Sequence, residues 1–99
     1  MTKKKLDTGH ICPVCGYELN FKAWDNGYDS QEICSSCGTQ FGYNDFGTSK
    51  EEIISKWRTL RKNWIERGMK FKHSSSMLKL PSNDWNPSEQ LKNIPKEFL

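Results

Sequence analysis

The 99-residue sequence contains no long apolar run, and apolar residues make up only 34% of it. A helix that crosses a bilayer needs roughly 18 or more consecutive apolar residues, so we expect no membrane-spanning segment. The basic start, Met1 to Lys5, is not followed by the apolar stretch that characterises a secretory signal. We therefore expect a cytoplasmic protein, and in that compartment paired cysteines hold a metal more often than they form disulfides.

The sequence also lacks the motifs of common catalytic sites. It has no glycine-rich phosphate-binding loop, and its two histidines, His10 and His73, belong to no recognisable pairing of a nucleophile with a base. Internal repeats and long low-complexity tracts are absent as well. We therefore predict a protein that is not an enzyme and that has no small-molecule substrate.

Length and charge together predict one domain with two parts. A chain this short supports a single domain, residues 1–99, and its apolar core alone gives only marginal stability. Residues 1–47 carry four lysines and six acidic residues, whereas residues 48–99 carry eleven Lys or Arg and six acidic residues. All four cysteines lie in the acidic part. We predict a cysteine-rich zinc-ribbon part over 1–47 and a basic, helical extension over 48–99 that packs on it.

The strongest motif is a pair of Cys-x-x-Cys-Gly turns, separated by 18 residues. Their four cysteines are Cys12, Cys15, Cys34 and Cys37. This spacing is typical of a four-cysteine zinc site, since each turn aims two sulfurs at one ion. Four thiolates close the tetrahedral shell, so the predicted Zn²⁺ is structural and not catalytic. Such sites contribute on the order of 10–16 kcal/mol to the folding of small zinc-finger peptides.

Two other interpretations of the cysteines remain open. They could form two disulfides, although the expected compartment disfavours this. They could also hold iron, because Cys15-Gly16-Tyr17 resembles the first metal-binding turn of rubredoxins, and tetrahedral four-sulfur geometry does not separate zinc from iron. Rubredoxins are shorter and acidic, which favours zinc here. His10 precedes Cys12 closely, but four cysteines already complete the shell, so we expect an exposed histidine.

The residues around the cysteines predict short antiparallel strands. Apolar and polar residues alternate over 17–22, which is the period of a half-buried strand. Asp25-Asn26-Gly27 then favours a tight turn, and residues 28–33 can return as the partner strand. Aromatic residues in 41–46 predict a third strand or an aromatic-rich loop. The expected fold class is a small α+β, metal-stabilised domain of the zinc-ribbon or rubredoxin-like kind.

The extension is predicted to contain an amphipathic helix and a short terminal helix. Ser49 and Glu52 form a capping box at the start of the first helix, and Gly68 is its expected stop. One face carries apolar residues at helical spacing and should pack on the ribbon; these residues are Ile53, Trp57, Leu60 and Trp64. Asn86 and Pro87 begin the terminal helix, which Pro95 ends.

Basic and aromatic residues of this extension are the candidates for a partner surface. Arg61 projects between Trp57 and Trp64, where it could stack on their rings or pair with an acidic group. The opposite face mixes basic and acidic side chains and is typical of a solvated surface. The tract over residues 69–73 adds positive charge. The full set of candidates is Trp57, Arg58, Arg61, Lys62, Trp64, Lys70 and Lys72.

The order of these features resembles a family of small, mostly uncharacterised bacterial cysteine-rich proteins. That family has a Cys-Pro-x-Cys-Gly-Tyr turn, a Cys-x-x-Cys-Gly-x-x-Phe-Gly turn, a basic helix with Trp, and a terminal Asn-Trp-x-Pro-x-Glu-Gln-Leu segment. The matching ranges here are 12–17, 34–42, 56–68 and 83–91. Asp84 interrupts the last motif, and Ser35 replaces a proline that is frequent in the relatives. Some such proteins accompany toxin systems, so the resemblance implies an immunity role and no catalytic residues.

Three functions are therefore carried forward. The first is a zinc-stabilised protein–protein interaction module, with an immunity protein that neutralises a toxin as its most specific form. The second is a nucleic-acid-binding zinc ribbon that uses the basic residues, and its affinity would fall steeply with salt. The third is a rubredoxin-like iron electron carrier.

Overall fold

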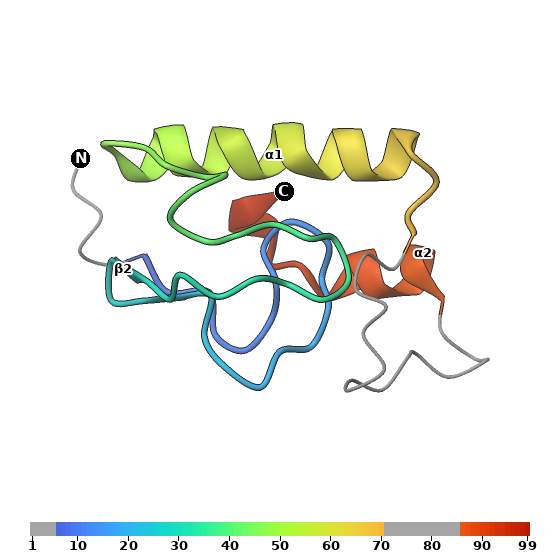
Figure 1. Cartoon of the computed structure of the whole chain (residues 1–99), viewed down its shortest axis with the longest axis horizontal. Helices are drawn as coiled ribbons and strands as arrows, with labels where there is room; N and C mark the ends of the chain where they lie inside the picture. Colours follow the sequence, from blue (N-terminus) through green and yellow to red (C-terminus); the bar gives the residue numbers. More distant parts are fainter. Residues whose placement is uncertain (1–5, 71–85) are drawn as a thin grey trace.

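The computed structural model describes residues 6–70 and 86–99. A single long helix, α1 (Lys50–Glu66), lies across the top of a loop-rich N-terminal region (Figure 1). The C-terminal residues form three short helices below it, α2 (Pro87–Gln90), η1 (Leu91–Asn93) and η2 (Lys96–Phe98). In the described ranges, the regular sheet is limited to the hairpin of β1 (Trp24–Asp25) and β2 (Tyr28–Asp29). The predicted small α+β class is confirmed at this level.

The hairpin forms at the predicted turn, but its strands are shorter than expected. Asn26 and Gly27 have φ angles of 50° and 87°, and positive values at both positions suit a tight hairpin turn. Residues 17–22 contribute only an isolated bridge between Ile11 and Glu18. On the return side, Gln31 has a φ of 62°, a left-handed conformation that interrupts the extended backbone after β2. The predicted strands over 17–22 and 28–33 were therefore too long.

The aromatic segment over 41–46 is a loop and not a third strand. The backbone N–H groups of Tyr43 and Asn44 both donate to the carbonyl of Gln40, which turns the chain back on itself. Gly42 has a φ of +93°, and a Cβ atom there would lie 2.4 Å from the Asp29 carboxyl carbon. The positive φ favours glycine here, and a side chain at this position would have to displace the Asp29 carboxylate.

Helix α1 begins and ends where the sequence predicts. Ser49 is the N-cap and accepts a hydrogen bond of 3.1 Å from the Glu52 N–H, whereas the Glu52 carboxylate reaches back to the Thr48 N–H at 2.6 Å. At the other end, Gly68 with a φ of +97° lets its N–H and that of Met69 bond to carbonyls of the last turn. The predicted apolar face is buried through Ile53, Trp57 and Trp64, with Leu60 partly buried.

A buried carboxylate joins the hairpin to α1. Asp45 is fully buried, and one of its oxygens accepts hydrogen bonds from the indole N–H groups of Trp24 at 2.9 Å and Trp57 at 2.6 Å. Its other oxygen accepts from the Gly42 N–H. A buried polar group is costly unless it is hydrogen-bonded, and three donors satisfy this one. Asp45 therefore links the hairpin and the turn at Gly42 to α1.

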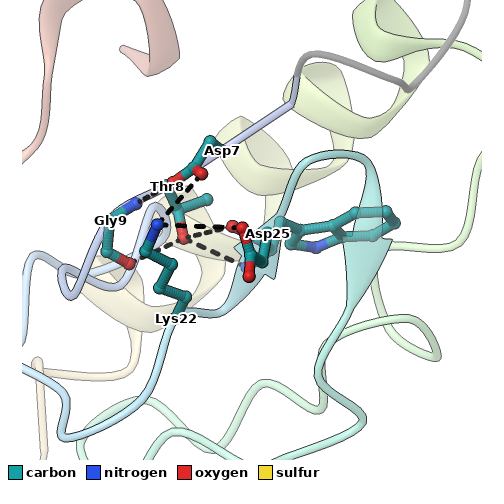
Figure 2. Close-up of polar contacts among 6 residues, drawn as sticks. Asp7, Thr8, Gly9, Lys22 and Asp25 are labelled. Carbon is teal, nitrogen blue, oxygen red and sulfur yellow. Dashed lines mark hydrogen bonds and ion pairs between the residues drawn. The ribbon is translucent and has the colours of Figure 1, made fainter.

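The segment that leads into the first cysteine is fastened to the hairpin (Figure 2). The Thr8 N–H donates to the Trp24 carbonyl at 3.0 Å, and the Trp24 N–H donates to the Thr8 hydroxyl at 3.1 Å. Beside this pair, the Asp7 carboxylate accepts from the Gly9 N–H at 2.8 Å and lies 3.2 Å from the Lys22 ammonium group. The Gly9 hydrogen bond and then Lys22 hold the pKa of Asp7 below its ordinary value.

Candidate metal centre

The four cysteines converge on one buried point. Their sulfur atoms all lie within 4.8 Å of one another, and the four residues are buried. The Sγ atoms of Cys12 and Cys37 are 3.8 Å apart, and those of Cys15 and Cys34 are 3.7 Å apart. Tetrahedral zinc with bonds of about 2.3 Å requires sulfur–sulfur separations of about 3.8 Å. The donor set therefore fits a single tetrahedral ion.

Two turns of the same construction supply the sulfurs, the first knuckle (residues 12–17) and the second knuckle (residues 34–39). In each knuckle the N–H of the glycine donates to the carbonyl of the first cysteine at 2.8 Å. In each, the N–H of that first cysteine donates to the carbonyl two residues beyond the second cysteine, at 2.9 Å to Tyr17 and at 2.9 Å to Thr39. Gly16 and Gly38 have φ angles of +85° and +80°, as this turn requires. The shared Cys-x-x-Cys-Gly pattern thus produces the same local structure twice.

The electrostatics of the cluster favour a bound cation. Burial raises the pKa of the Cys12 and Cys15 thiols well above the ordinary cysteine value, so both hold their protons when no metal is present. The pKa of Cys37 is lowered, because the neighbouring thiols donate hydrogen bonds to its thiolate. One thiolate can be stabilised in this way, but four together need a divalent cation to offset their charge.

Arg61 holds the first knuckle from the side of α1. Its Nε donates to the Val14 carbonyl at 2.9 Å, and its Nη2 donates to the Pro13 carbonyl at 2.7 Å. The same Nη2 reaches the Phe98 carbonyl of η2 at 2.8 Å. Arg61 therefore binds backbone oxygens that lie between the two cysteines of this knuckle. The sequence had suggested an aromatic ring or an acidic group as its partner, and these hydrogen bonds go to neither.

The C-terminal helices hold the same knuckle from another direction. The Gln90 side-chain amide donates to the Cys15 carbonyl and to the Ser36 hydroxyl, both at 3.1 Å. The Asn93 amide donates to the Gly16 carbonyl at 3.1 Å. A Cβ atom at Gly16 would lie 2.0 Å from the Gln90 carbonyl oxygen, so the contact of α2 with the knuckle requires glycine. The sequence predicted a helical segment here, but it did not predict what the amides of Gln90 and Asn93 bind.

The second knuckle borders open space. Cys37 is 7% exposed, whereas the other three cysteines have no exposed surface. Its sulfur makes a contact of 3.2 Å with the Thr39 hydroxyl. Beside it lies a cavity of about 510 Å³ between the knuckle and the C-terminal half of α1, and its wall includes Cys37, Thr39, Leu60, Asn63, Arg67 and Lys70. Of the two knuckles, the second is thus the one whose cysteines are not completely covered.

The structure separates the candidates for a partner surface. Trp57 and Trp64 are buried and belong to the core. Arg58 is exposed, and its Nε donates to the Leu99 carbonyl at 2.7 Å. Lys62 and Lys70 are exposed on and after α1. Lys72 and His73 lie outside the described residues, as does most of the basic tract over 69–73. His10 is exposed, as the sequence predicts.

The chain matches no protein family, curated protein or solved structure in the comparisons. The structure itself defines a small α+β protein whose four clustered cysteines form a candidate structural metal site. Across residues 6–70 and 86–99, no helix has the length and the apolar content that crossing a membrane demands.

Proposed function

We propose that this chain is a cytoplasmic zinc-ribbon protein whose metal is structural and whose role is to bind another protein. The metal site is supported by the four buried sulfurs, which lie close together with two separations near those of a tetrahedral zinc site. Because the four cysteines would complete a tetrahedral shell, the ion would have no open position for a substrate. The proposal therefore includes no enzymatic activity.

Zinc is the proposed ion, and iron is its competitor. Four thiolates in a tetrahedron accept either metal. Zinc has no redox chemistry and no colour, whereas iron in a four-thiolate site is coloured and redox-active. An absorbance spectrum of the purified protein with a metal assay decides between them: a colourless protein with one zinc per chain supports the proposal, and a red, iron-containing protein favours an electron carrier.

Exposed aromatic and aliphatic side chains support the protein-binding part. Three large aromatic residues of the N-terminal half are unusually open, with Tyr28 at 77%, Tyr43 at 74% and Phe46 at 61% exposure, and Ile33 is also exposed. Tyr and Phe are enriched in the buried centres of protein interfaces. Tyr28 follows the hairpin turn, Ile33 directly precedes the second knuckle, and Tyr43 and Phe46 follow that knuckle. They are better placed to meet a partner than Trp57 and Trp64, which are buried.

The immunity role is the most specific form of the proposal. It rests on the resemblance of the two knuckles and of the terminal segment to cysteine-rich proteins that accompany bacterial toxins. Such a partner would be recovered as a protein in fixed proportion to this chain.

A tagged pull-down from the native host tests the function, with nuclease treatment and metal content read on the same eluate. A nuclease-resistant protein at fixed stoichiometry, lost when Tyr28, Tyr43 and Phe46 are all changed to Ser, supports a protein-binding module. Ile65→Ser is the matched control, because Ile65 is an exposed apolar residue on α1. A toxin in the eluate makes the immunity role concrete. Recovery that depends on nucleic acid and falls with salt contradicts the proposal in favour of nucleic-acid binding.

A further inference from the structure

The four cysteines differ in how well the protein covers them. Arg61 and the C-terminal helices close the first knuckle, and the Gln90 amide also donates to Ser36, the residue before Cys37. Cys12, Cys15 and Cys34 have no exposed surface, whereas Cys37 is 7% exposed and forms part of the cavity wall. Among the described cysteines, Cys37 is therefore the one that solvent reaches, and the cavity lies beside it.

The cavity wall combines access with positive charge. Arg67 and Lys70 line it, and both are exposed residues at the C-terminal end of α1. Among the described residues that line this wall, none is acidic. Positive charge on the wall of a cavity attracts anionic reagents into it, and partial exposure is a feature of cysteines that react with oxidants.

We propose that Cys37 is an oxidant-reactive cysteine, and that its oxidation joins it to Cys12 and opens the metal centre. The inference rests on the proposed metal site. Cys12 is the natural partner, because its sulfur lies 3.8 Å from that of Cys37. Cys15 and Cys34 form the other close pair at 3.7 Å, but both are fully covered. The exposure of Cys37 thus selects the first sulfur to react, and the sulfur separation selects Cys12 as its partner.

The chemistry requires hydrogen peroxide as the oxidant. The Cys37 thiolate attacks one peroxide oxygen, the O–O bond breaks, and the departing hydroxide takes up a proton to become water. Cys37 is then a sulfenic acid, oxidised by two electrons. The Cys12 thiolate attacks the Cys37 sulfur, an S–S bond forms, and a second hydroxide leaves as water. Two of the four thiolates are consumed, so the remaining two cannot hold a tetrahedral ion firmly.

The test is an oxidation map of the purified, full-length protein whose metal content has first been measured. The protein is treated with less than one equivalent of hydrogen peroxide, free thiols are alkylated, and the disulfides are assigned by peptide mass spectrometry. A metal-binding dye follows release of the ion. The expected result is a dominant Cys12–Cys37 disulfide that forms in step with metal release. A first disulfide between Cys15 and Cys34, or an even mixture of pairs, would overturn the inference.

A cavity-filling variant tests the route. Asn63→Phe places a large ring in the cavity wall, and oxidation should slow by roughly fivefold or more because reactivity follows exposure. Thr59→Phe is the matched control on an exposed position of α1 outside that wall, and its rate should be unchanged. Equal rates in the two variants would contradict a route through the cavity.

A second measurement does not depend on how Asn63→Phe folds. The rates of reaction with an anionic and with a neutral aromatic disulfide reagent are compared in the wild-type protein and in Arg67→Gln and Lys70→Gln. The ratio of anionic to neutral rates should fall by about threefold, because each substitution removes a cation from the wall. Lys62→Gln, on α1 but outside the cavity wall, should leave the ratio unchanged. An unchanged ratio in all three variants would count against the inference.

The two proposals fail in different ways. A folded protein that contains no metal before the oxidant is added contradicts the metal site. The disulfide map is read afterwards, and it depends only on which cysteines are covered. A zinc-containing protein that oxidises first at Cys15 and Cys34 keeps the metal site and contradicts the inference about Cys37.

Discussion

The two knuckles have the same backbone hydrogen bonds but different surroundings. The first is enclosed by Arg61 of α1 and by Gln90 and Asn93 of the C-terminal helices. The second faces a cavity, and its Cys37 keeps some exposure. The difference shows that a Cys-x-x-Cys-Gly sequence determines its own turn, whereas the protection of its sulfurs comes from residues far away in the chain. The following predictions test that contrast.

The largest loss of stability is expected from substitution of the metal ligands, at which the two knuckles are equivalent. Cys15→Ser and Cys34→Ser each remove one of the four sulfurs, so both variants should lose the ion and most of their stability. The expected loss is on the order of 10 kcal/mol, because a structural zinc contributes most of the folding free energy of a small domain. Near-UV circular dichroism and metal content measure the outcome. A variant that keeps both its metal and its near-UV spectrum would show that its cysteine is not a ligand.

The next effect should separate the knuckles. Gly16→Ala and Gly38→Ala both introduce a side chain at a positive φ, which costs about 1–2 kcal/mol. Gly16→Ala also forces a Cβ atom to within 2.0 Å of the Gln90 carbonyl oxygen and must displace α2. Denaturant unfolding should therefore show a loss for Gly16→Ala that exceeds the loss for Gly38→Ala by about 2 kcal/mol or more. Equal losses would mean that α2 does not press on the first knuckle.

Two arginines near the metal centre, Arg61 and Arg67, should differ in how much each contributes to stability. Arg61→Ala removes three hydrogen bonds from a half-buried guanidinium to backbone carbonyls, and we expect a loss of about 3 kcal/mol. Arg67→Ala changes an exposed residue of the cavity wall and should stay within about 0.5 kcal/mol of the wild type. Thermal unfolding of both variants checks this prediction. Similar melting temperatures would contradict the role of Arg61 as an anchor of the first knuckle.

The smallest effect concerns the segment that enters the first knuckle. The pKa of Asp7 is lower in the folded protein than its ordinary value of 3.8, so its contribution to stability is present above that pH. The contribution is lost as the pH falls through the lower folded pKa. Asp7→Asn should cost a few tenths of a kcal/mol near neutral pH, because Asp7 is largely exposed. The difference from the wild type should shrink below pH 4, and a difference that is constant with pH would exclude this ionic contribution.

Features encoded over a few residues could be predicted from the sequence. Ser49 and Gly68 gave the start and stop of α1, Asn26 and Gly27 gave the hairpin turn, and the cysteine spacing gave the sulfur cluster. The caps, the hairpin turn and each single knuckle depend on chemistry within a few residues, and the meeting of the two knuckles was predicted because four thiolates complete the shell of one metal ion. The return strand over 28–33 was predicted too long, because a turn signal does not reveal an interruption such as the left-handed Gln31.

Contacts between distant residues could not be predicted in the same way. Asp45 looked like one acidic residue among several, and only the fold brings it between Trp24 and Trp57. Arg61 was recognised as lying on the apolar face of α1, but its carbonyl partners are in the first knuckle and in η2. No local pattern marks such pairings, since they depend on how three separate segments meet.

The central claim is that four cysteines hold one structural metal ion, and native mass spectrometry of the purified protein tests it most directly. Mass and near-UV circular dichroism are recorded before and after treatment with a strong chelator. The account predicts one zinc ion per chain, and its removal should abolish the near-UV signal of the buried tryptophans. A metal-free protein with four reduced cysteines and the same near-UV signal would contradict the account.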